Sequence, residues 1–475
     1  MFDATERWIL GVVVAACFFL LIGYAAYFYR LTKTYADYNL AGRSASLFPM
    51  ILTIVGTAIG GSVLLGAMSQ GYVGGLGQIW LPGSFTVTSI LLAVFFLRRI
   101  REVGEQHDMV SIADFTALRF GDRARIPTIV SILCAYCAIT GMQFVAIASI
   151  LHLVFGLSVT AGILIAWLLL TLKTYLGGLK AVIWSDAVLG TLQTVAVIVL
   201  LAVVYLRLGG WGEIERLAAA GGQRDMLQFG GITLQELAVV FLTIGAYQFV
   251  RQDLWQRIWA AKSLATIRWA YWIGLTVAFL TGAVVVVLGA LAAIGLDLDL
   301  ADPGLVYYAI IQEVLPLPLV ALMIVALLST VISCADSFFI AGASSIANDI
   351  IRPRLKRTDE RTLLRYSRLS VVLMSLIALA LALYLPNLVQ MWILGSAMLV
   401  SGLLAPVLAA LIWPRLSPRA GLASMWIGLL TALLWQVAGQ PLGWHPVFVG
   451  LPVSILVLAA GSLIAARAPA SARAA

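Results

Sequence analysis

Charged side chains are scarce in this chain: only 11% of its 475 residues are Asp, Glu, Lys or Arg, whereas 62% are hydrophobic. A water-soluble globular domain carries far more charge than this, so the composition excludes a soluble fold. The charges are also unbalanced, because 30 Lys and Arg face 22 Asp and Glu and give a formal net charge of +8. The long apolar runs between them predict an all-α polytopic membrane protein.

Cysteine and histidine are rare as well, and their placement excludes two kinds of site. The four cysteines, Cys17, Cys134, Cys137 and Cys334, all fall in apolar segments, so we expect no disulfide framework. The three histidines are scattered without ligand spacing, which argues against a zinc site. No Asp-rich or His-rich loop offers converging acids, so we expect neither enzyme activity nor an organic cofactor.

Thirteen apolar segments are predicted, each close to the roughly 20 residues that cross about 30 Å of hydrocarbon. They lie at 8–29, 47–70, 78–97, 126–153, 158–176, 185–206, 233–250, 269–294, 317–346, 364–384, 388–413, 420–437 and 446–466. The first is too long for the core of a signal peptide, so we expect it to be retained. The seventh is the weakest, since Thr243, Gly245 and Gln248 interrupt it.

Basic residues indicate which side each loop occupies. With the N-terminus outside, 26 of the 30 Lys and Arg fall on the inner side, and the outer side keeps Arg7, Arg207, Arg216 and Arg224. The positive-inside rule therefore predicts an external N-terminus and a cytoplasmic C-terminus. We expect a multi-pass protein of the plasma membrane, a bacterial inner membrane in particular. The basic loops are then solvated cytoplasmic faces, which argues against binding of nucleic acid.

Glycines interrupt two segments that stand five apart. The second segment contains Gly-Thr-Ala-Ile-Gly-Gly-Ser at 56–62, and the seventh contains Thr-Ile-Gly-Ala at 243–246. Transporters built from two inverted repeats use such interrupted helices to form a site at the membrane midplane. The pattern predicts one transmembrane domain over 1–475. Its parts are an extra helix at 8–29, a first repeat at 47–206, a second repeat at 233–413 and two extra helices at 420–466.

The ninth segment carries hydroxyl groups where hydrocarbon is expected. On a helix, Ala326, Ser329, Thr330 and Ser333 share one face. That face offers the oxygen atoms that a hard cation such as Na⁺ prefers. At ~1.5 Å per residue, Ser329 lies roughly 18 Å from one surface and Gly56 roughly 14 Å from the other, so both come near the midplane. The pattern indicates a cation site between the two segments; close helix packing is the alternative.

Four motifs carry a resemblance to a known family. They are Asn-Leu-Ala-Gly-Arg-Ser at 39–44, Thr-Tyr-Leu-Gly-Gly-Leu-Lys-Ala-Val-Ile-Trp-Ser-Asp at 174–186, Gln256-Arg257 followed by Ala-Ala-Lys-Ser at 260–263, and the stretch 326–336. Together they resemble the sodium:solute symporter family, which has the LeuT-type inverted-repeat fold. The resemblance implies thirteen transmembrane helices, with repeats formed by helices 2–6 and 7–11 and with helices 2 and 7 broken. It also implies Na⁺-coupled uptake of a small organic solute by alternating access.

The resemblance implies a Na⁺ site at five positions. Its ligands would be the carbonyls of Gly56, Ile59 and Ala326 and the hydroxyls of Ser329 and Thr330. Five oxygens without a carboxylate would bind Na⁺ weakly enough to release it. Na⁺ is therefore the coupling ion that we expect.

Some relatives bind a second Na⁺ through an aspartate and further hydroxyls. The matching positions include Asp186 and Ser333, but Ile332 replaces one ligand, so we expect a single Na⁺. Asp186 could instead tune the inner pathway or cap a helix at the interface. Asp336 is expected either to face the inner cavity or to pair with a basic loop residue.

The resemblance also implies a solute site between the second and seventh segments. Candidate contacts are Gly60, Gly61, Gln143, Tyr247, Gln248 and Arg251. An anionic solute could use Arg251, whereas a solvated arginine at the cytoplasmic end of the segment is the alternative. Trp80, Trp255 and Trp259 could form a cage for a cation or anchor the chain at the interface.

The solute itself stays open among amino acids, monocarboxylates, pantothenate-like acids and choline-like cations. A choline-like cation transporter and a solute sensor without transport are the alternatives to uptake of an amino acid or monocarboxylate, and an ion channel is a third class. The expected partners are the solute and the lipid bilayer, and a monomer could be the functional unit.

Overall fold

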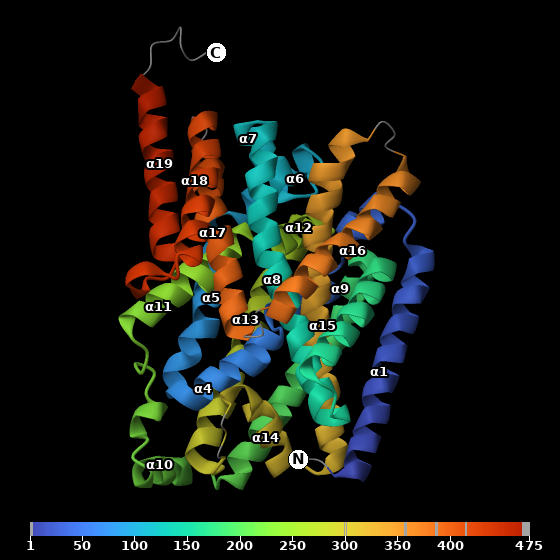
Figure 1. Cartoon of the computed structure of the whole chain (residues 1–475), viewed down its shortest axis with the longest axis vertical. Coiled ribbons are helices and arrows are strands. Elements are labelled where there is room, and N and C mark those ends of the chain that lie inside the picture. Colours follow the sequence, from blue (N-terminus) through green and yellow to red (C-terminus); the bar gives the residue numbers. More distant parts are fainter. Residues whose placement is uncertain are drawn as a thin grey trace.

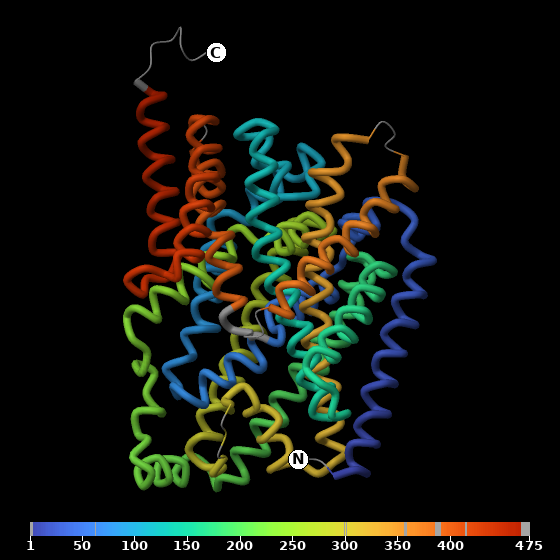
Figure 2. Tube along the Cα trace, in the orientation of Figure 1, coloured from blue at the N-terminus to red at the C-terminus, as the bar shows by residue number. Residues whose placement is uncertain are grey.

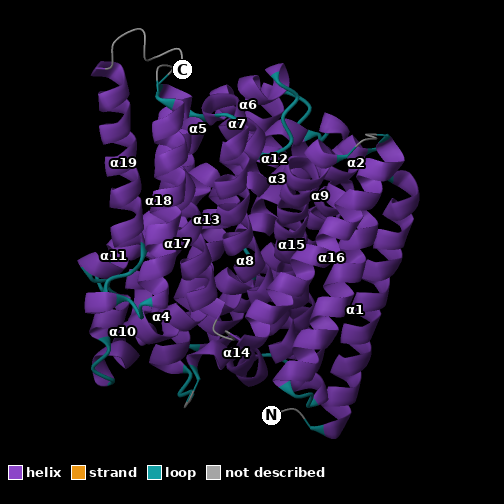
Figure 3. Ribbon diagram, turned by 45° about the horizontal axis from the view of Figure 1, so that its top comes forward, coloured by secondary structure: helices purple, strands orange, loops and turns teal. Residues whose placement is uncertain are grey.

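The structure, a computed structural model, describes residues 3–298, 300, 302–355, 359–384, 388–413 and 416–467. Within these residues the elements are helical, joined by loops and by one isolated backbone bridge between Ala45 and Ala261 (Figure 3). The α-helices are α1 (Ala4–Leu31), α2 (Tyr35–Leu40), α3 (Leu47–Ala58), α4 (Met68–Gly74), α5 (Trp80–Phe95), α6 (Leu97–Gln106), α7 (Ile112–Phe120), α8 (Arg125–Phe155), α9 (Val159–Arg207), α10 (Trp211–Ala220), α11 (Leu234–Val240), α12 (Gln252–Ala260), α13 (Leu264–Gly295), α14 (Val306–Val314), α15 (Leu317–Ser345), α16 (Glu360–Tyr384), α17 (Leu388–Ile412), α18 (Pro418–Val437) and α19 (Val447–Arg467). The last residues of the predicted domain, 468–475, lie outside the described residues.

Shorter helical turns link these elements. Three have π-helical hydrogen bonding, at Ser62–Ala67, Phe241–Gly245 and Ile346–Ile351. The others are 3-10 turns, at Ala41–Arg43, Gly75–Ile79, Asp122–Ala124, Arg224–Leu227, Ala246–Val250, Pro303–Leu305, Arg352–Arg354 and Pro441–Gly443. Single π-helical turns are frequent at functional sites, and two of those found here adjoin the interruptions described below.

Ten helical runs in the described part of the chain are long and apolar enough to cross a membrane, so this is a multi-pass membrane protein. One of them, α9, has 49 residues and would measure about 74 Å if straight, more than twice the ~30 Å of hydrocarbon. It turns at Gly178, where φ is 67° and ψ is −179°, a conformation that glycine adopts without strain. α9 therefore contains both predicted segments 158–176 and 185–206. The total of thirteen crossings stays a prediction.

The two ends of the molecule carry different parts of the chain. The start of α1 and α10 lie at one end, and α6, α7 and the end of α19 lie at the other (Figure 1). Most of the long helices run between these two ends (Figure 2). The sequence assigns the same groups to opposite sides of the membrane, with the first group outside. Which end faces the cytoplasm stays a prediction.

The second predicted segment is interrupted after α3. This helix ends at Ala58, and Ile59 adopts an extended backbone with φ of −113° and ψ of 92°. The chain then resumes as the π-helical turn Ser62–Ala67. Because the last carbonyls of a helix have no partner within it, this interruption frees backbone oxygens inside the bundle.

The seventh predicted segment is also interrupted. α11 continues as a π-helical turn and then as the 3-10 turn Ala246–Val250. Arg251 leaves helical geometry, with φ of −72° and ψ of 110°, and α12 begins at the next residue. The non-helical residue is thus Arg251, six positions beyond the glycine at which the sequence locates the interruption.

α15 is the buried helix on which the candidate site is built. Every residue from Ala326 to Ser345 is buried, polar ones included. α15 packs against α3, α8, α9 and α16. Since buried polar groups need hydrogen-bond partners, the contacts of its hydroxyls and carboxylate show what this helix holds together.

Candidate functional site

α3 and the residues that follow it approach α15 closely at glycines. A Cβ atom on Gly56 would lie 2.6 Å from the Ser333 hydroxyl oxygen, and one on Gly61 would lie 3.2 Å from Val331 Cγ2. Glycine at position 56 is required for this approach, because a side chain there would push the helices apart.

Two of the predicted Na⁺ ligands on α15 hydrogen-bond to carbonyls of their own helix. The Ser329 hydroxyl donates to the carbonyl of Val325 at 2.7 Å, and that of Thr330 donates to the carbonyl of Ala326 at 2.9 Å. A hydroxyl that donates its proton keeps lone pairs for a cation. Ala326 and Thr330 thus bring two oxygens together, both buried.

The other two predicted ligands lie where α3 ends. Gly56 is in the last turn of the helix, so its carbonyl is among those without a helical partner, and Ile59 follows the helix with 0% exposure. Gly56 packs against Ser333, one turn further along α15 than Ser329. The two helices that the depth estimate brings together do pack against each other, and Gly56 lies one turn away from Ser329.

Asp186 and Ser333, the residues predicted for a second ion, do meet. The Ser333 hydroxyl donates to one carboxylate oxygen of Asp186, and that of Thr53 donates to the other at 2.5 Å. The guanidinium of Arg257 lies 3.6 Å from the same carboxylate, and both side chains are buried. Asp186 is therefore neither a helix cap nor free of partners, since a fixed cation neutralises it.

Arg257 is a buried residue of this region that sequence reasoning missed. One of its terminal nitrogens donates to the hydroxyls of Thr57 and Ser337, each at 2.6 Å. It therefore ties α12 to both α3 and α15, beside the interruption of α3. Its only signal in the sequence was its place in the Gln256-Arg257 motif, which indicated the family and gave no contact.

Asp336 pairs with a basic residue, one of the two expected outcomes. Its carboxylate forms an ion pair with the ammonium of Lys173 and accepts a hydrogen bond from the Thr174 hydroxyl at 2.8 Å. Both charged side chains are buried, at 7% and 0% exposure. The pair joins α15 to the first half of α9, just before its turn at Gly178.

A small cavity of about 20 Å³ lies between the two interruptions, with room for about one water molecule. Its walls come from α3 and the following residues, α5, α8, the Ala246–Val250 turn, α15 and α17. The residues are Thr57, Ala58, Gly60, Phe85, Ile139, Tyr247, Gln248, Arg251, Cys334, Phe338 and Trp392. Four of the six candidate solute contacts thus line one cavity.

The remaining two candidates, Gly61 and Gln143, adjoin this cavity. The backbone N–H of Gly61 donates to the side-chain oxygen of Gln143 at 3.1 Å. The amide nitrogen of Gln143 donates in turn to the carbonyl of Ile139, which lines the cavity. Gln143 therefore satisfies backbone groups around the interruption of α3, and it connects α8 to that interruption.

Arg251 is buried, at 7% exposure, so a solvated arginine at the end of the segment is wrong. Its Nε and Nη2 donate to the two oxygens of Asp253, at 3.1 and 2.5 Å. Its Nη1 donates to the side-chain oxygen of Gln248 at 3.0 Å. The guanidinium also lies 5.3 Å from the ring centre of Tyr247 and 5.6 Å from that of Phe338. The arginine is held rigidly at the wall of the cavity.

The three tryptophans do not form a cage. Trp255 and Trp259 are buried and pack edge to face at 5.8 Å, and their ring N–H groups donate to backbone carbonyls. Trp80 lies elsewhere, is 38% exposed and donates to the carbonyl of Phe229. The cation cage suggested by these residues is wrong, because two of them are part of the protein core.

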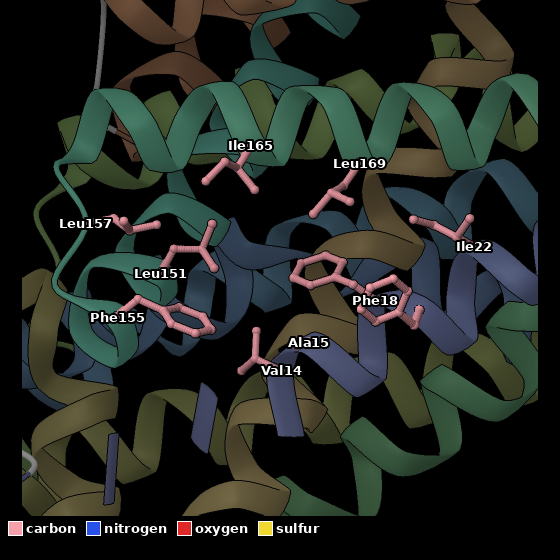
Figure 4. A pocket seen from close by; sticks show the side chains of 10 residues that line it. Val14, Ala15, Phe18, Ile22, Leu151, Phe155, Leu157, Ile165 and Leu169 are labelled. Atoms are coloured by element: carbon pink, nitrogen blue, oxygen red, sulfur yellow. The ribbon is translucent and has the colours of Figure 1, made fainter. Parts of the chain in front are cut away.

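A second pocket, of about 350 Å³, lies between α1 and the ends of α8 and α9 (Figure 4). Its labelled side chains, such as Phe18, Leu151 and Ile165, are hydrocarbon (Figure 4). Such a wall offers no partner for the polar part of a solute. The cavity beside Arg251 is smaller, but its wall includes polar side chains that this pocket lacks.

Sequence comparison gives one family match and many relatives. The model of the sodium:solute symporter family matches residues 38–428. A sodium/proline symporter of Staphylococcus aureus is 25% identical over 438 residues, which are 89% of this chain and 85% of that protein.

Structural comparison supports the same fold. A Na⁺-coupled sialic acid symporter, solved in a substrate-bound outward-open state, superposes with a TM-score of 0.81 at 15% identity over 96% of this chain and 97% of its own. Mhp1, a nucleobase-cation-symport-1 family transporter, superposes with a TM-score of 0.57 at 12% identity over 92% and 96%. At these identities the likeness concerns the fold.

Proposed function

The chain belongs to the sodium:solute symporter family, and we propose that it couples inward movement of Na⁺ to uptake of a small organic solute by alternating access. One observation carries the proposal: the interrupted helix α3 packs Gly56 against Ser333 on the buried helix α15. Such interrupted helices at mid-depth are the usual location of ion and substrate sites in transporters with inverted repeats.

The Na⁺ site proposed here uses the carbonyls of Gly56, Ile59 and Ala326 and the hydroxyls of Ser329 and Thr330. Three features support it: the carbonyls freed where α3 ends, the 2.9 Å contact between Thr330 and the carbonyl of Ala326, and the burial of all five residues. Neutral oxygens would hold Na⁺ without trapping it. At 100 mV each Na⁺ contributes about 2.3 kcal/mol of electrical driving force.

One Na⁺ per cycle is proposed rather than two. Asp186 and Ser333 would be needed for the second ion, yet the carboxylate already accepts two hydroxyl hydrogen bonds and has Arg257 3.6 Å away. A Na⁺ at this carboxylate would be repelled by the guanidinium. The absence of a hydroxyl at Ile332 supports the same conclusion.

The architecture proposed for this mechanism is a LeuT-type pair of inverted repeats over 47–206 and 233–413, with thirteen crossings and an external N-terminus. The two interruptions, after α3 and before α12, fall in the first segment of each proposed repeat. Binding of Na⁺ would hold α3 and α15 together in the outward-facing state. Loss of Na⁺ to the cytoplasm would let the helices separate and release the solute.

The test is Na⁺-dependent uptake into proteoliposomes by Ser329→Ala and Thr330→Ala. Each variant removes one proposed ligand and should raise the Na⁺ concentration for half-maximal uptake roughly tenfold, the effect of about 1.4 kcal/mol. Ser345→Ala is the matched control, because it removes a buried hydroxyl of α15 that has no hydrogen-bond partner in the described residues. It should leave the Na⁺ dependence unchanged.

The same assay separates a carrier from the other classes. A symporter shows saturable Na⁺ uptake that requires solute, whereas a channel passes Na⁺ without it and a sensor moves neither. Unaltered Na⁺ dependence in both Ser329→Ala and Thr330→Ala would rule out the proposed ion site.

A further inference from the structure

The buried charges around the cavity cancel. Arg251 and Arg257 carry two positive charges, and Asp253 and Asp186 carry two negative ones, all linked by the ion pairs described above. Each of the four side chains is at most 9% exposed. Because an unpaired charge is costly in a buried site, the site favours an ion and a solute whose charges add up to zero. A single Na⁺ would leave this region with one excess positive charge.

The cavity wall provides one charged group, and it is positive. Among the described residues that line it, Arg251 alone is charged. Position 58, which also lines the wall, is an alanine and adds no charge. The nearest acid, Asp253, already accepts two hydrogen bonds from Arg251 and one from the Tyr136 hydroxyl at 2.7 Å. A positively charged solute group would meet no available carboxylate there.

Aromatic rings do not compensate for the missing acid. Phe85, Tyr247, Phe338 and Trp392 line the cavity, and rings of this kind can bind an organic cation. However, the Arg251 guanidinium already lies within 6 Å of the ring centres of Tyr247 and Phe338. A solute cation on these rings would stand beside a fixed charge of the same sign.

A negatively charged solute group, by contrast, would find hydrogen-bond donors at the cavity wall. A guanidinium has five N–H groups, and the hydrogen bonds of Arg251 to Asp253 and Gln248 use three of them. The Tyr247 hydroxyl is buried and has no hydrogen-bond partner of ordinary geometry in the described residues, and Tyr247 lines the same cavity. Carboxylates are well matched to a guanidinium edge and a hydroxyl.

We infer that the solute is a small monocarboxylate with an apolar body and no amino group, bound by Arg251 and Tyr247. This inference rests on the proposed function, since it names the substrate class of the same site. The carboxylate would accept hydrogen bonds from the free N–H groups of Arg251 and from the Tyr247 hydroxyl. The four rings, which here enclose room for about one water molecule, would move apart to surround the apolar body. Na⁺ and a monocarboxylate together add no net charge to the neutral core.

The test compares matched solutes on the purified full-length protein. Carboxylates of two to six carbons, including cyclopentanecarboxylate, are each paired with the corresponding amide, amine and amino acid; proline differs from cyclopentanecarboxylate by one ring nitrogen. The measurements are thermal stabilisation with and without Na⁺ and Na⁺-dependent uptake into proteoliposomes. We expect a response to at least one carboxylate and none to the amides, amines or amino acids.

The outcomes separate the two proposals. A response to an amine, amide or amino acid whose matched carboxylate is silent overturns the inference and leaves Na⁺-coupled transport intact. Stabilisation by Na⁺ with no response to any carboxylate also overturns the inference. If Na⁺ neither stabilises the protein nor supports uptake of any solute, the proposed function is overturned.

Tyr247→Phe tests the carboxylate contact with little change to the fold, because the hydroxyl that it removes has no hydrogen-bond partner of ordinary geometry in the described residues. The half-saturating carboxylate concentration should rise roughly tenfold or more, as for loss of a hydrogen bond to a charged group. Tyr308→Phe, which removes an equally unpartnered hydroxyl on α14, is the control and should change nothing. Equal behaviour of the two variants contradicts a role for Tyr247.

A second variant removes the cation itself. The double substitution Arg251→Gln with Asp253→Asn leaves no charge of this pair unpaired, so the protein should still fold. It should keep stabilisation by Na⁺ and lose stabilisation by the carboxylate. Retention of the carboxylate response in this variant would show that Arg251 does not bind it.

Discussion

Two neighbouring parts of α15 hold their polar groups in different ways. In the hydroxyl turn, formed by Ser329 and Thr330, both hydroxyls donate to carbonyls of α15 itself. In the charged turns, residues 333–337, polar groups instead meet Arg257 and Lys173 from other helices. Both parts are fully buried, so exposure does not distinguish them.

The two parts of α15 differ in the source of the positive charge that their polar groups can meet. Near the charged turns the protein supplies fixed cations, which neutralise the acids and join helices. The hydroxyl turn offers neutral oxygen atoms, whose lone pairs can bind a mobile cation and release it again. An ion that must bind and dissociate in every cycle therefore fits the hydroxyl turn, whereas the charged turns give the bundle a stable framework.

The largest expected effect comes from breaking an ion pair of the charged turns. Lys173→Met leaves Asp336 as an uncompensated buried carboxylate, so we expect the protein to lose about 3–5 kcal/mol of stability. The measurement is thermal unfolding in detergent. Lys180→Met is the control, because this lysine of the same helix is 35% exposed and lies 3.9 Å from Asp37.

Restoring the balance of charge tests the cause. Lys173→Met combined with Asp336→Leu replaces the pair by hydrocarbon of similar size and should recover most of the lost stability. If the double variant is as unstable as Lys173→Met alone, the loss comes from packing, and the framework role of the charged turns is wrong.

A smaller effect should show where α3 meets α15. Gly56→Ala places a methyl group 2.6 Å from the Ser333 hydroxyl and should cost about 1–3 kcal/mol of stability. Because Ser333→Ala removes the clashing oxygen, the two substitutions should be coupled by at least about 0.5 kcal/mol in a double-mutant cycle. Gly56→Ala with Ser329→Ala should add independently. Coupling to Ser329 instead would move the contact to the hydroxyl turn.

The last prediction is that the membrane potential has no effect on solute accumulation. The buried acids are neutralised by the buried arginines and the lysine that pair with them. If one Na⁺ then enters with one monocarboxylate, the transport cycle moves no net charge. Solute accumulation in proteoliposomes should then be the same with and without a K⁺ diffusion potential of 100 mV, negative inside. One net charge per cycle would change it roughly 50-fold, from about 2.3 kcal/mol. Such a change would contradict either the single Na⁺ or the anionic solute.

The sequence predicted those features that depend on residues close together in the chain. Glycines marked the interruption after α3, and helical spacing grouped Ser329 and Thr330 on one face. The depth estimate brought α3 to α15 but placed Gly56 level with Ser329, one turn away from Ser333, which lies beside it. The second interruption was identified in the right segment and assigned to Gly245 rather than Arg251.

The sequence did not predict which charged residues pair with each other when they lie far apart in the chain. Arg251 and Lys173 were counted among loop residues because both adjoin the ends of apolar segments, yet both are buried and paired. Arg257 neutralises Asp186 across 71 residues of sequence, and no local spacing encodes such a contact. A buried charge reveals its partner only when packing of the helices is known.

The pairing of Lys173 with Asp336 also has a consequence for synthesis. The two residues stand 163 positions apart, and Lys173 is made first. At about 5–20 residues per second, the ribosome needs roughly 8–33 s to add the intervening chain. During that interval the first half of α9 lacks the carboxylate that neutralises it. Its lysine must stay near lipid headgroups or water, so α9 reaches its final depth only after α15 has been inserted.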